Sequence, residues 1–164
     1  MTRARAARWQ ASGFTLVELM LTLAIMAILV TVAVPLVQVS VQREKERELR
    51  TALTQIRDAL DAYKRATEQG RIPANIGESG YPKTLEALVE GVEDQRSPTA
   101  AKLYFLRRLP SDPMSATQGL SAEQTWNLRS YQSPPDDPQE GDDVFDIYSK
   151  SDKVGLNGVP YRDW

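Results

Sequence analysis

The side chains in this sequence that could do chemistry are carboxylates, hydroxyls and amines. The chain of 164 residues contains no cysteine and no histidine. The common nucleophile–base pairs, thiolate metal sites and histidine-bound zinc or iron sites therefore cannot be built from it. Three candidates remain, which are a cluster of aspartates near residue 140, an oxygen-rich tail over residues 149–163, and a lone carboxylate at Glu18.

The aspartate cluster offers paired carboxylates, which general acid–base catalysis and glycoside cleavage both use. It surrounds a proline-rich stretch that is typical of a loop, and no nucleophile at a recognisable turn accompanies it. We interpret the cluster as a solvated acidic loop, and we do not expect the chain to be an enzyme. Its members are Asp136, Asp137, Asp142, Asp143 and Asp146.

Glu18 lies at the start of an apolar segment. The 24 residues from Leu19 to Gln42, named the apolar segment below, carry no charge. A helix of that length extends about 36 Å, enough for a hydrocarbon core of about 30 Å. A carboxylate at the edge of such a helix is costly and needs a partner. The alternative is a Glu18 side chain that only extends to the membrane interface.

The charges on either side of the apolar segment predict its direction. Residues 1–13 carry Arg3, Arg5 and Arg8 and no acid, whereas residues 43–164 carry 17 basic and 21 acidic side chains. The positive-inside rule then places residues 1–13 in the cytoplasm and residues 43–164 across the membrane. The acidic balance argues against nucleic acid as a partner, which would need a basic stripe. On hydropathy alone, an uncleaved single-pass anchor that displays a binding domain fits as well.

A basic leader, a six-residue motif and the apolar segment follow one another in the chain, and this order indicates a protein family. Gly13-Phe14-Thr15-Leu16-Val17-Glu18 resembles the prepilin cleavage motif of type IV pilins and type II secretion pseudopilins. The resemblance implies that a membrane aspartyl peptidase cuts after Gly13 and methylates the amine of Phe14. It also implies that Glu18 pairs with the new amine of Phe14 on a neighbouring copy and so aligns an incoming subunit on a filament.

Pro35 lies inside the apolar segment, at a position where many members of that family carry a helix-kinking proline. Proline removes one backbone hydrogen bond and clashes with the preceding turn. Local melting in an assembled filament and a kink tolerated in a membrane helix both fit this residue.

A long helix is predicted beyond the apolar segment as well. The alternating charges of residues 43–50 indicate a solvated helical face, and apolar residues then recur with a helical period from Leu49 to Tyr63, which gives a stripe for a domain to pack on. We expect one helix from Phe14 to Gln69, followed by Gly70 in the left-handed conformation.

The predicted fold class is α+β, with a small antiparallel sheet packed on the C-terminal half of the long helix, as in pilins. A short helix is expected over 84–89 with Thr84 as its N-cap, strands over 125–131 and 144–148, and Trp164 docked in the core. The predicted domains are a leader (1–13), a membrane or filament-core helix (14–42), a soluble helix half (43–70) and a head (71–164).

A second resemblance lies in residues 104–114, which read Tyr-Phe-Leu-Arg-Arg-Leu-Pro-Ser-Asp-Pro-Met. They are similar to the tyrosine, leucine–proline and aspartate–proline signature of the G-class major pseudopilin of type II secretion. Met114 and Ser115 stand where tryptophan and glycine often follow, and the spacing before Leu109 is one residue longer than in common forms.

The tail resembles the calcium loop near the C-terminus of major pseudopilins. Oxygen-bearing side chains and glycines in a tight loop suit a hard cation such as Ca²⁺. The implied ligands are Ser149 and Asp152, with Asn157 or Asp163 in place of a second aspartate. A metal-free turn is the alternative.

Together these resemblances imply a structural subunit of a periplasmic pseudopilus that supports type II protein secretion. The subunit would cross the inner membrane once, with a cytoplasmic leader and a periplasmic head. Its implied partners are other copies in a helical homopolymer, minor pseudopilins and an inner-membrane assembly platform, the prepilin peptidase and membrane lipid. A type IV pilin or a minor pseudopilin is the alternative, although pilin heads commonly carry a disulfide-closed loop and this chain has no cysteine.

Overall fold

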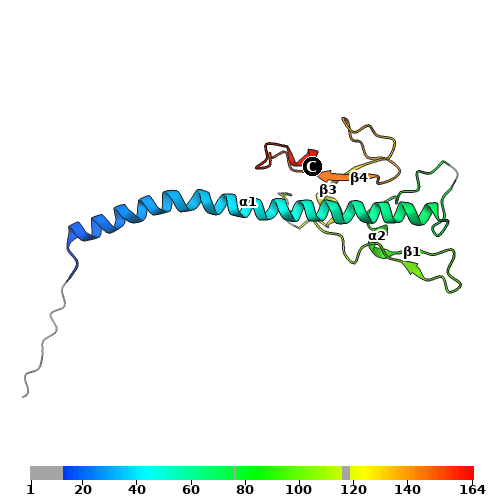
Figure 1. Cartoon of the computed structure of the whole chain (residues 1–164), viewed down its shortest axis with the longest axis horizontal. Helices are drawn as coiled ribbons and strands as arrows, with labels where there is room; N and C mark the ends of the chain where they lie inside the picture. The colour runs from blue at the N-terminus through cyan, green and yellow to red at the C-terminus, as the bar shows by residue number, and fades with distance from the viewer. Residues whose placement is uncertain (1–12, 76, 116–118) are drawn as a thin grey trace, which may run out of the picture. The chain divides into compact units, whose positions relative to one another are not determined.

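The computed structural model describes residues 13–75, 77–115 and 119–164. The leader arginines Arg3, Arg5 and Arg8 lie outside these residues. The described residues up to Val41 form one compact unit, named the first unit, and Gln42–Trp164 form the second unit. Helix α1 (Leu16–Glu68) contributes to both units, and all the strands belong to the second (Figure 1).

Helix α1 begins two residues later than the sequence predicts, at Leu16 instead of Phe14. Thr15 precedes it, and the Thr15 Oγ1 accepts a hydrogen bond from the backbone N–H of Glu18 at 3.2 Å. This bond satisfies one of the free donors of the first helical turn, as N-cap threonines do. Thr15 and Glu18 also have the threonine-x-x-glutamate spacing of a capping box. The cap therefore leaves Gly13 and Phe14 outside the helix.

Helix α1 ends at Glu68, one residue before the predicted end, and for a local reason. Gly70 has a φ of 67°, which confirms the predicted left-handed conformation and which glycine adopts without strain. The N–H of Arg71 donates to the Ala66 carbonyl at 3.0 Å, and the N–H of Gly70 donates to the Thr67 carbonyl at 2.8 Å. These two bonds make a Schellman motif, which satisfies carbonyls of the last turn.

The predicted apolar stripe of α1 forms one side of the hydrophobic core of the second unit. Its members from Leu49 to Leu60 are at most 5% exposed, and burying such side chains is the main favourable contribution to folding. Tyr63, at the end of the stripe, is half-buried against the core. The buried core residues are Leu49, Ala52, Leu53, Ile56, Ala59, Leu60, Leu85, Leu88, Trp126, Val144, Ile147 and Tyr161.

The short helix differs from its prediction. Helix α2 is Ala87–Glu90, and Glu86 precedes it without a side-chain capping bond. The prediction of Thr84 as the N-cap is wrong, because the acceptor near this helix comes from another segment. The N–H of Leu85 donates to Glu123 Oε1 at 3.3 Å.

The predicted α+β class is confirmed, and in the part of the chain that the structure describes four short strands form two small antiparallel sheets where the sequence predicted one. The predicted strands over 125–131 and 144–148 correspond to the pair β3–β4, whereas the pair β1–β2 is too short to show an alternating pattern. The strands are β1 (Val92–Glu93), β2 (Lys102–Leu103), β3 (Trp126–Arg129) and β4 (Asp146–Ser149).

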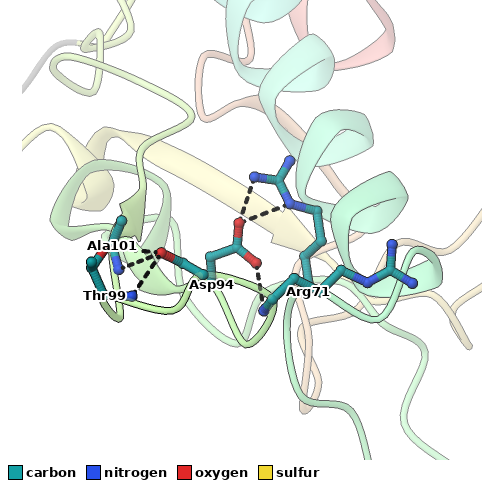
Figure 2. Close-up of polar contacts among 6 residues, drawn as sticks. Arg71, Asp94, Thr99 and Ala101 are labelled. Carbon is teal, nitrogen blue, oxygen red and sulfur yellow. Dashed lines mark hydrogen bonds and ion pairs between the residues drawn. The ribbon is translucent and has the colours of Figure 1, made fainter.

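An ion pair joins the β1–β2 hairpin to the chain just after α1 (Figure 2). Asp94 is 8% exposed, and its Oδ2 accepts hydrogen bonds from the Arg71 guanidinium at 2.6 and 3.0 Å. These bonds favour the charged carboxylate, so Arg71 holds the pKa of Asp94 below its ordinary value. Within the hairpin, the Ser97 hydroxyl accepts from the N–H groups of Thr99 and Ala101. Polar contacts therefore hold this hairpin in place.

Candidate functional site

The peptide bond between Gly13 and Phe14 lies in an irregular segment before α1. Phe14 is 79% exposed, and no atom of the described residues lies within 4 Å of the position that a side chain on Gly13 would take. Exposed irregular backbone is the preferred substrate of proteases. The structure thus leaves the predicted cleavage bond accessible, and the Thr15 cap is the reason that it is not helical.

Glu18 lies in the first turn of α1, where the helix dipole favours a negative charge. Its side chain is exposed. Within residues 13–75, 77–115 and 119–164, no Lys or Arg side chain forms an ion pair with it. These residues supply the predicted carboxylate acceptor but not its cation.

The first unit presents apolar side chains to its surroundings. From Leu16 to Val41, the large apolar residues in its exposed set are 38–77% exposed. Helix α1 is long and apolar enough to cross a membrane, with a mean hydropathy of 2.6 over its most apolar stretch. An exposed apolar surface of this extent marks a membrane or protein interaction site. The helix continues through Pro35, and melting there stays a prediction.

In the second unit, residues 109–113 are fixed to the β3–β4 sheet. The Trp126 indole Nε1 donates to the Pro110 carbonyl at 2.8 Å. Asp112 is 4% exposed, and its carboxylate accepts a hydrogen bond from the Ser149 hydroxyl at 2.6 Å. Its own N–H donates to Thr125 Oγ1 at 2.9 Å. A buried polar group without a partner costs about 1–3 kcal/mol. These hydrogen bonds therefore allow Asp112 to be buried, and they hold residues 109–113 against the sheet.

Comparison with known proteins now decides the family. Residues 10–34 match the model described as the prokaryotic N-terminal methylation motif, a range that includes Gly13, Phe14 and Glu18. The type II secretion system core protein G of Pseudomonas aeruginosa is 34% identical over 110 residues, which cover 65% of this chain and 70% of that protein. The chain belongs to the type II secretion system core protein G family.

Other G proteins match more of the chain. The core protein G of Klebsiella pneumoniae is 28% identical over 138 residues, or 80% of this chain and 91% of that protein. The core protein G of Dickeya chrysanthemi is 26% identical over 151 residues, or 89% of this chain and 92% of that protein. No solved structure matches the chain at a significant level. A match of 151 residues necessarily includes parts of both units, so the G-family relationship is not confined to the methylation motif.

The calcium site that the G-family resemblance implies depends on four side chains in the tail. Ser149 is 1% exposed, and its hydroxyl is committed to Asp112. The Asn157 Oδ1 accepts the N–H of Val159 at 3.1 Å. Asp152 and Asp163 are exposed and border a hollow together with Ser149. Asn157 borders a different hollow, which Asp163 also lines.

These side chains do not fit a calcium ion in this arrangement. Calcium takes six to eight oxygen ligands, and Lys150 and Arg162 border the same hollow as Asp152 and Asp163. No group of three histidine, cysteine or acidic side chains that could hold a metal occurs in the part of the chain that the structure describes. The calcium site stays a prediction of the resemblance.

Glu46 fastens the tail to α1, a role that the predicted solvated face did not include. Glu46 is 5% exposed, and its Oε1 accepts from the Leu156 N–H at 2.8 Å and from the Tyr161 hydroxyl at 3.0 Å. The Gln42 amide donates to the same hydroxyl oxygen at 2.9 Å. Burial, with a contribution from Glu46, raises the pKa of the Tyr161 hydroxyl, which therefore keeps its proton. The sequence did contain a signal for the burial of Glu46. Glu46 precedes Leu49 by three residues, so it lies on the same helical face as the apolar stripe.

Arg57 and Arg50 hold the last residue. The Arg57 guanidinium donates to Asp146 at 2.8 Å and to the Trp164 main-chain oxygen at 2.9 Å. The Arg50 guanidinium carbon lies 4.3 Å from the centroid of the Trp164 ring, within the range of a cation–π contact. Trp164 is half-buried and packs edge-on against Tyr161, so its predicted docking is confirmed at the margin of the core.

The predicted acidic loop uses carboxylates to make structural contacts. Asp143 accepts the N–H of Tyr131 at 2.9 Å, and Asp137 accepts the Gln139 side-chain amide at 2.8 Å. Asp146 is the ion-pair partner of Arg57. Each of these three carboxylates has a hydrogen-bonding role in the fold, as loop-closing side chains do.

Proposed function

We propose that this chain is a structural, non-catalytic subunit of a periplasmic pseudopilus filament that supports type II protein secretion. One arrangement carries the proposal. An exposed Gly13–Phe14 bond, a capped helix start and an exposed Glu18 precede a helix with a large exposed apolar surface. Membership of the G family and the match to the methylation motif support the same function.

Before processing, the apolar segment spans the inner membrane, with the leader in the cytoplasm and the second unit in the periplasm. The three leader arginines and the absence of leader acids support this direction. A prepilin peptidase then cuts after Gly13, and the new amine of Phe14 is methylated. Cleavage removes the basic leader and retains the apolar segment, so the mature chain stays anchored.

Assembly exchanges lipid for neighbouring copies around the apolar segment. The amine of Phe14 on one copy pairs with Glu18 on another, because an unpaired carboxylate in an apolar helix bundle is costly. An ion pair of this kind fixes register, since every other register leaves both charges without a partner. Minor pseudopilins and an inner-membrane platform are the remaining proposed partners.

Mass spectrometry of the membrane-extracted protein tests the proposal. The wild-type chain should begin at methylated Phe14 when it is expressed with the secretion system, whereas a Gly13→Ala variant should keep its leader. A Ser12→Ala variant, changed at the neighbouring residue, is the control and should be processed. Normal processing of Gly13→Ala would refute the cleavage site. A strictly monomeric chain with an intact leader, found by in-membrane crosslinking, would instead support the uncleaved single-pass anchor.

A further inference from the structure

A hollow of about 850 Å³ lies in the second unit, beside the C-terminal end of α1. It is bordered by described residues of 73–84, which follow α1 in the chain, and by both ends of the loop that connects β3 to β4. Ligand sites in proteins are concave, measure about 300–1,000 Å³, and combine aromatic side chains with a few polar groups. None of the residues that border this hollow takes part in the proposed processing or assembly, so the hollow needs an explanation of its own.

One wall of the hollow is a group of packed aromatic rings. The ring of Tyr131 stacks on that of Tyr81, with centroids 6.0 Å apart, and Phe145 meets both rings edge-on at 5.5 and 5.1 Å. Tyr131 is nevertheless 57% exposed, and both tyrosines border the hollow. Packing against two other rings fixes the orientation of Tyr131. Its exposed surface is therefore a rigid apolar platform at the edge of the hollow.

The opposite wall is held in place by hydrogen bonds. The Lys64 ammonium group on α1 donates to the Ser79 carbonyl at 2.7 Å. The Glu78 carboxylate accepts from the backbone N–H and the side-chain amide of Asn75 at 2.9 and 3.1 Å. Gly80 has a φ of 82°, which glycine adopts without strain. The hollow is thus largely formed before any ligand enters, which lowers the ordering cost of binding.

The charges in the lining exclude an anionic ligand. Three carboxylates, those of Glu78, Asp142 and Asp143, border the hollow together with one ammonium group, that of Lys83. An anion would be repelled by this excess of negative charge. Glu78 is already paired with Lys83 at 3.4 Å, and Asp143 accepts the N–H of Tyr131 at 2.9 Å. Two of the three carboxylates therefore serve the fold.

The remaining polar groups of the lining suit a ligand that both donates and accepts hydrogen bonds. Thr84, Gln132 and Asp142 are exposed at the hollow, and among the described residues their side chains have no hydrogen-bond partner. The hydroxyl and the amide each donate and accept, whereas the carboxylate only accepts. An apolar ligand would leave these groups unpaired, which is costly. A single cationic group would use the carboxylate and leave the hydroxyl and the amide unused.

We propose that this hollow binds a short neutral saccharide. One C–H face of a sugar ring packs on Tyr131, and the sugar hydroxyls exchange hydrogen bonds with Thr84, Gln132 and Asp142. A sugar combines an apolar ring face with hydroxyls that donate and accept, which matches an aromatic platform beside mixed polar groups. The inference goes beyond the proposed function and does not depend on cleavage at Gly13 or on filament assembly.

Saturation-transfer NMR on the full chain tests the site. The protein is held in an amine-oxide detergent, because a detergent with a sugar headgroup would compete. The probes are cellotetraose and chitotetraose, which are neutral tetramers without and with N-acetyl groups. We expect saturable transfer to at least one tetramer in the millimolar range, and Tyr131→Ala should weaken its affinity by about tenfold, the worth of one ring contact. Tyr104→Ala, at another exposed tyrosine, is the control and should bind as the parent does.

A second variant leaves the aromatic wall intact. Asp142→Asn changes one acceptor without altering the rings, and it should weaken binding several-fold. Asp58→Asn, at an exposed acid of α1 outside the lining, is the matched control and should bind normally. A loss confined to Tyr131→Ala, together with a lower melting temperature, would show that Tyr131 acts through the fold and would refute the platform.

Three further outcomes overturn the inference. Absence of saturable transfer to both tetramers in the parent refutes a saccharide site. Equal binding by the parent, Tyr131→Ala and Asp142→Asn shows that the sugar binds elsewhere. Binding of a tetralysine peptide that depends on Tyr131 and Asp142, without binding of either sugar, assigns the hollow to a basic partner.

Discussion

The first unit exposes its large apolar side chains, whereas the second unit buries side chains of the same kind. Between Leu16 and Val41, large apolar residues are 38–77% exposed. In the second unit the α1 residues from Leu49 to Leu60 that form the core are at most 5% exposed. Both sets lie on one helix with good helix formers, so helical propensity does not distinguish them. The difference is what covers the apolar surface.

The second unit has its own core and its own partners for buried polar groups. Glu46, Asp94 and Asp112 are each at most 8% exposed, and each accepts hydrogen bonds from elsewhere in the unit. The first unit has no such cover among its described residues. An exposed apolar surface of this extent marks a membrane or protein interaction site, so the two units should respond differently to the same kind of substitution.

The largest expected effect is on assembly, from a Glu18→Leu variant. Filament formation should fall below detection, because the variant lacks the proposed acceptor for the Phe14 amine. Membrane insertion should persist, since leucine increases the apolar character of the helix. In-membrane crosslinking and pelleting of filaments measure the two properties. A Glu44→Leu variant, with the same change at an exposed site beyond the apolar segment, should assemble. Normal filaments from the Glu18→Leu variant would refute the proposed role of Glu18 in assembly.

The next effect compares leucines of the two units. Leu60 is 1% exposed and Leu29 is 62% exposed. Leu60→Ala should lower the free energy of unfolding of the second unit by about 2–5 kcal/mol, because it leaves a cavity in the core. Leu29→Ala should change it by less than about 0.5 kcal/mol. Urea titration of the full chain in detergent, followed by tryptophan fluorescence, gives both values. Equal losses would show that the two units do not unfold separately.

A smaller effect concerns the ion pair of Arg71 and Asp94. Because the folded pKa of Asp94 is lowered, its charged form stabilises the fold at pH values above its ordinary value of 3.8. That stability is lost as the pH falls through the lower folded value. Arg71→Ala should therefore reduce the melting temperature near neutral pH, and the two proteins should converge in acid.

Melting curves at several pH values provide the measurement for this ion pair. Lys83→Ala, which removes an exposed ion pair with Glu78, is the control and should change little, because surface pairs contribute little. A constant difference between Arg71→Ala and the parent down to low pH would show that Arg71 acts through packing and not through charge.

The smallest expected effect is that of calcium removal. The tail is held by Glu46, Arg57 and Asp112, and four basic side chains line the hollow that Asp152 borders. We therefore expect a chelator to leave the melting temperature of the full chain unchanged. Added calcium at 100 times its dissociation constant would stabilise a true site by about 2.7 kcal/mol. A melting temperature that rises with calcium and falls with chelator would establish the calcium site that the resemblance implies.

The sequence alone predicted much of the first unit. The cleavage motif, Glu18 and the apolar segment are local patterns, because each depends on residues adjacent in the chain. The left-handed Gly70 of the second unit was predicted for the same reason. Even the late start of α1 was readable, since Thr15 and Glu18 have the spacing of a capping box. The apolar stripe was predicted for the same reason, as a helical period needs only one segment.

Only the tertiary structure showed which polar residues are buried. Glu46 meets Leu156 across 110 positions, Asp112 meets Ser149 across 37, and Arg71 meets Asp94 across 23. A charged residue in a helical sequence reads as solvated unless its distant partner is known, so Glu46 was assigned to the solvent and Ser149 to a metal. Local order determined the predicted cleavage motif and the long apolar helix. Long-range pairing decided which charges hold its second unit together, because a buried charge is tolerated only where the fold brings it a partner.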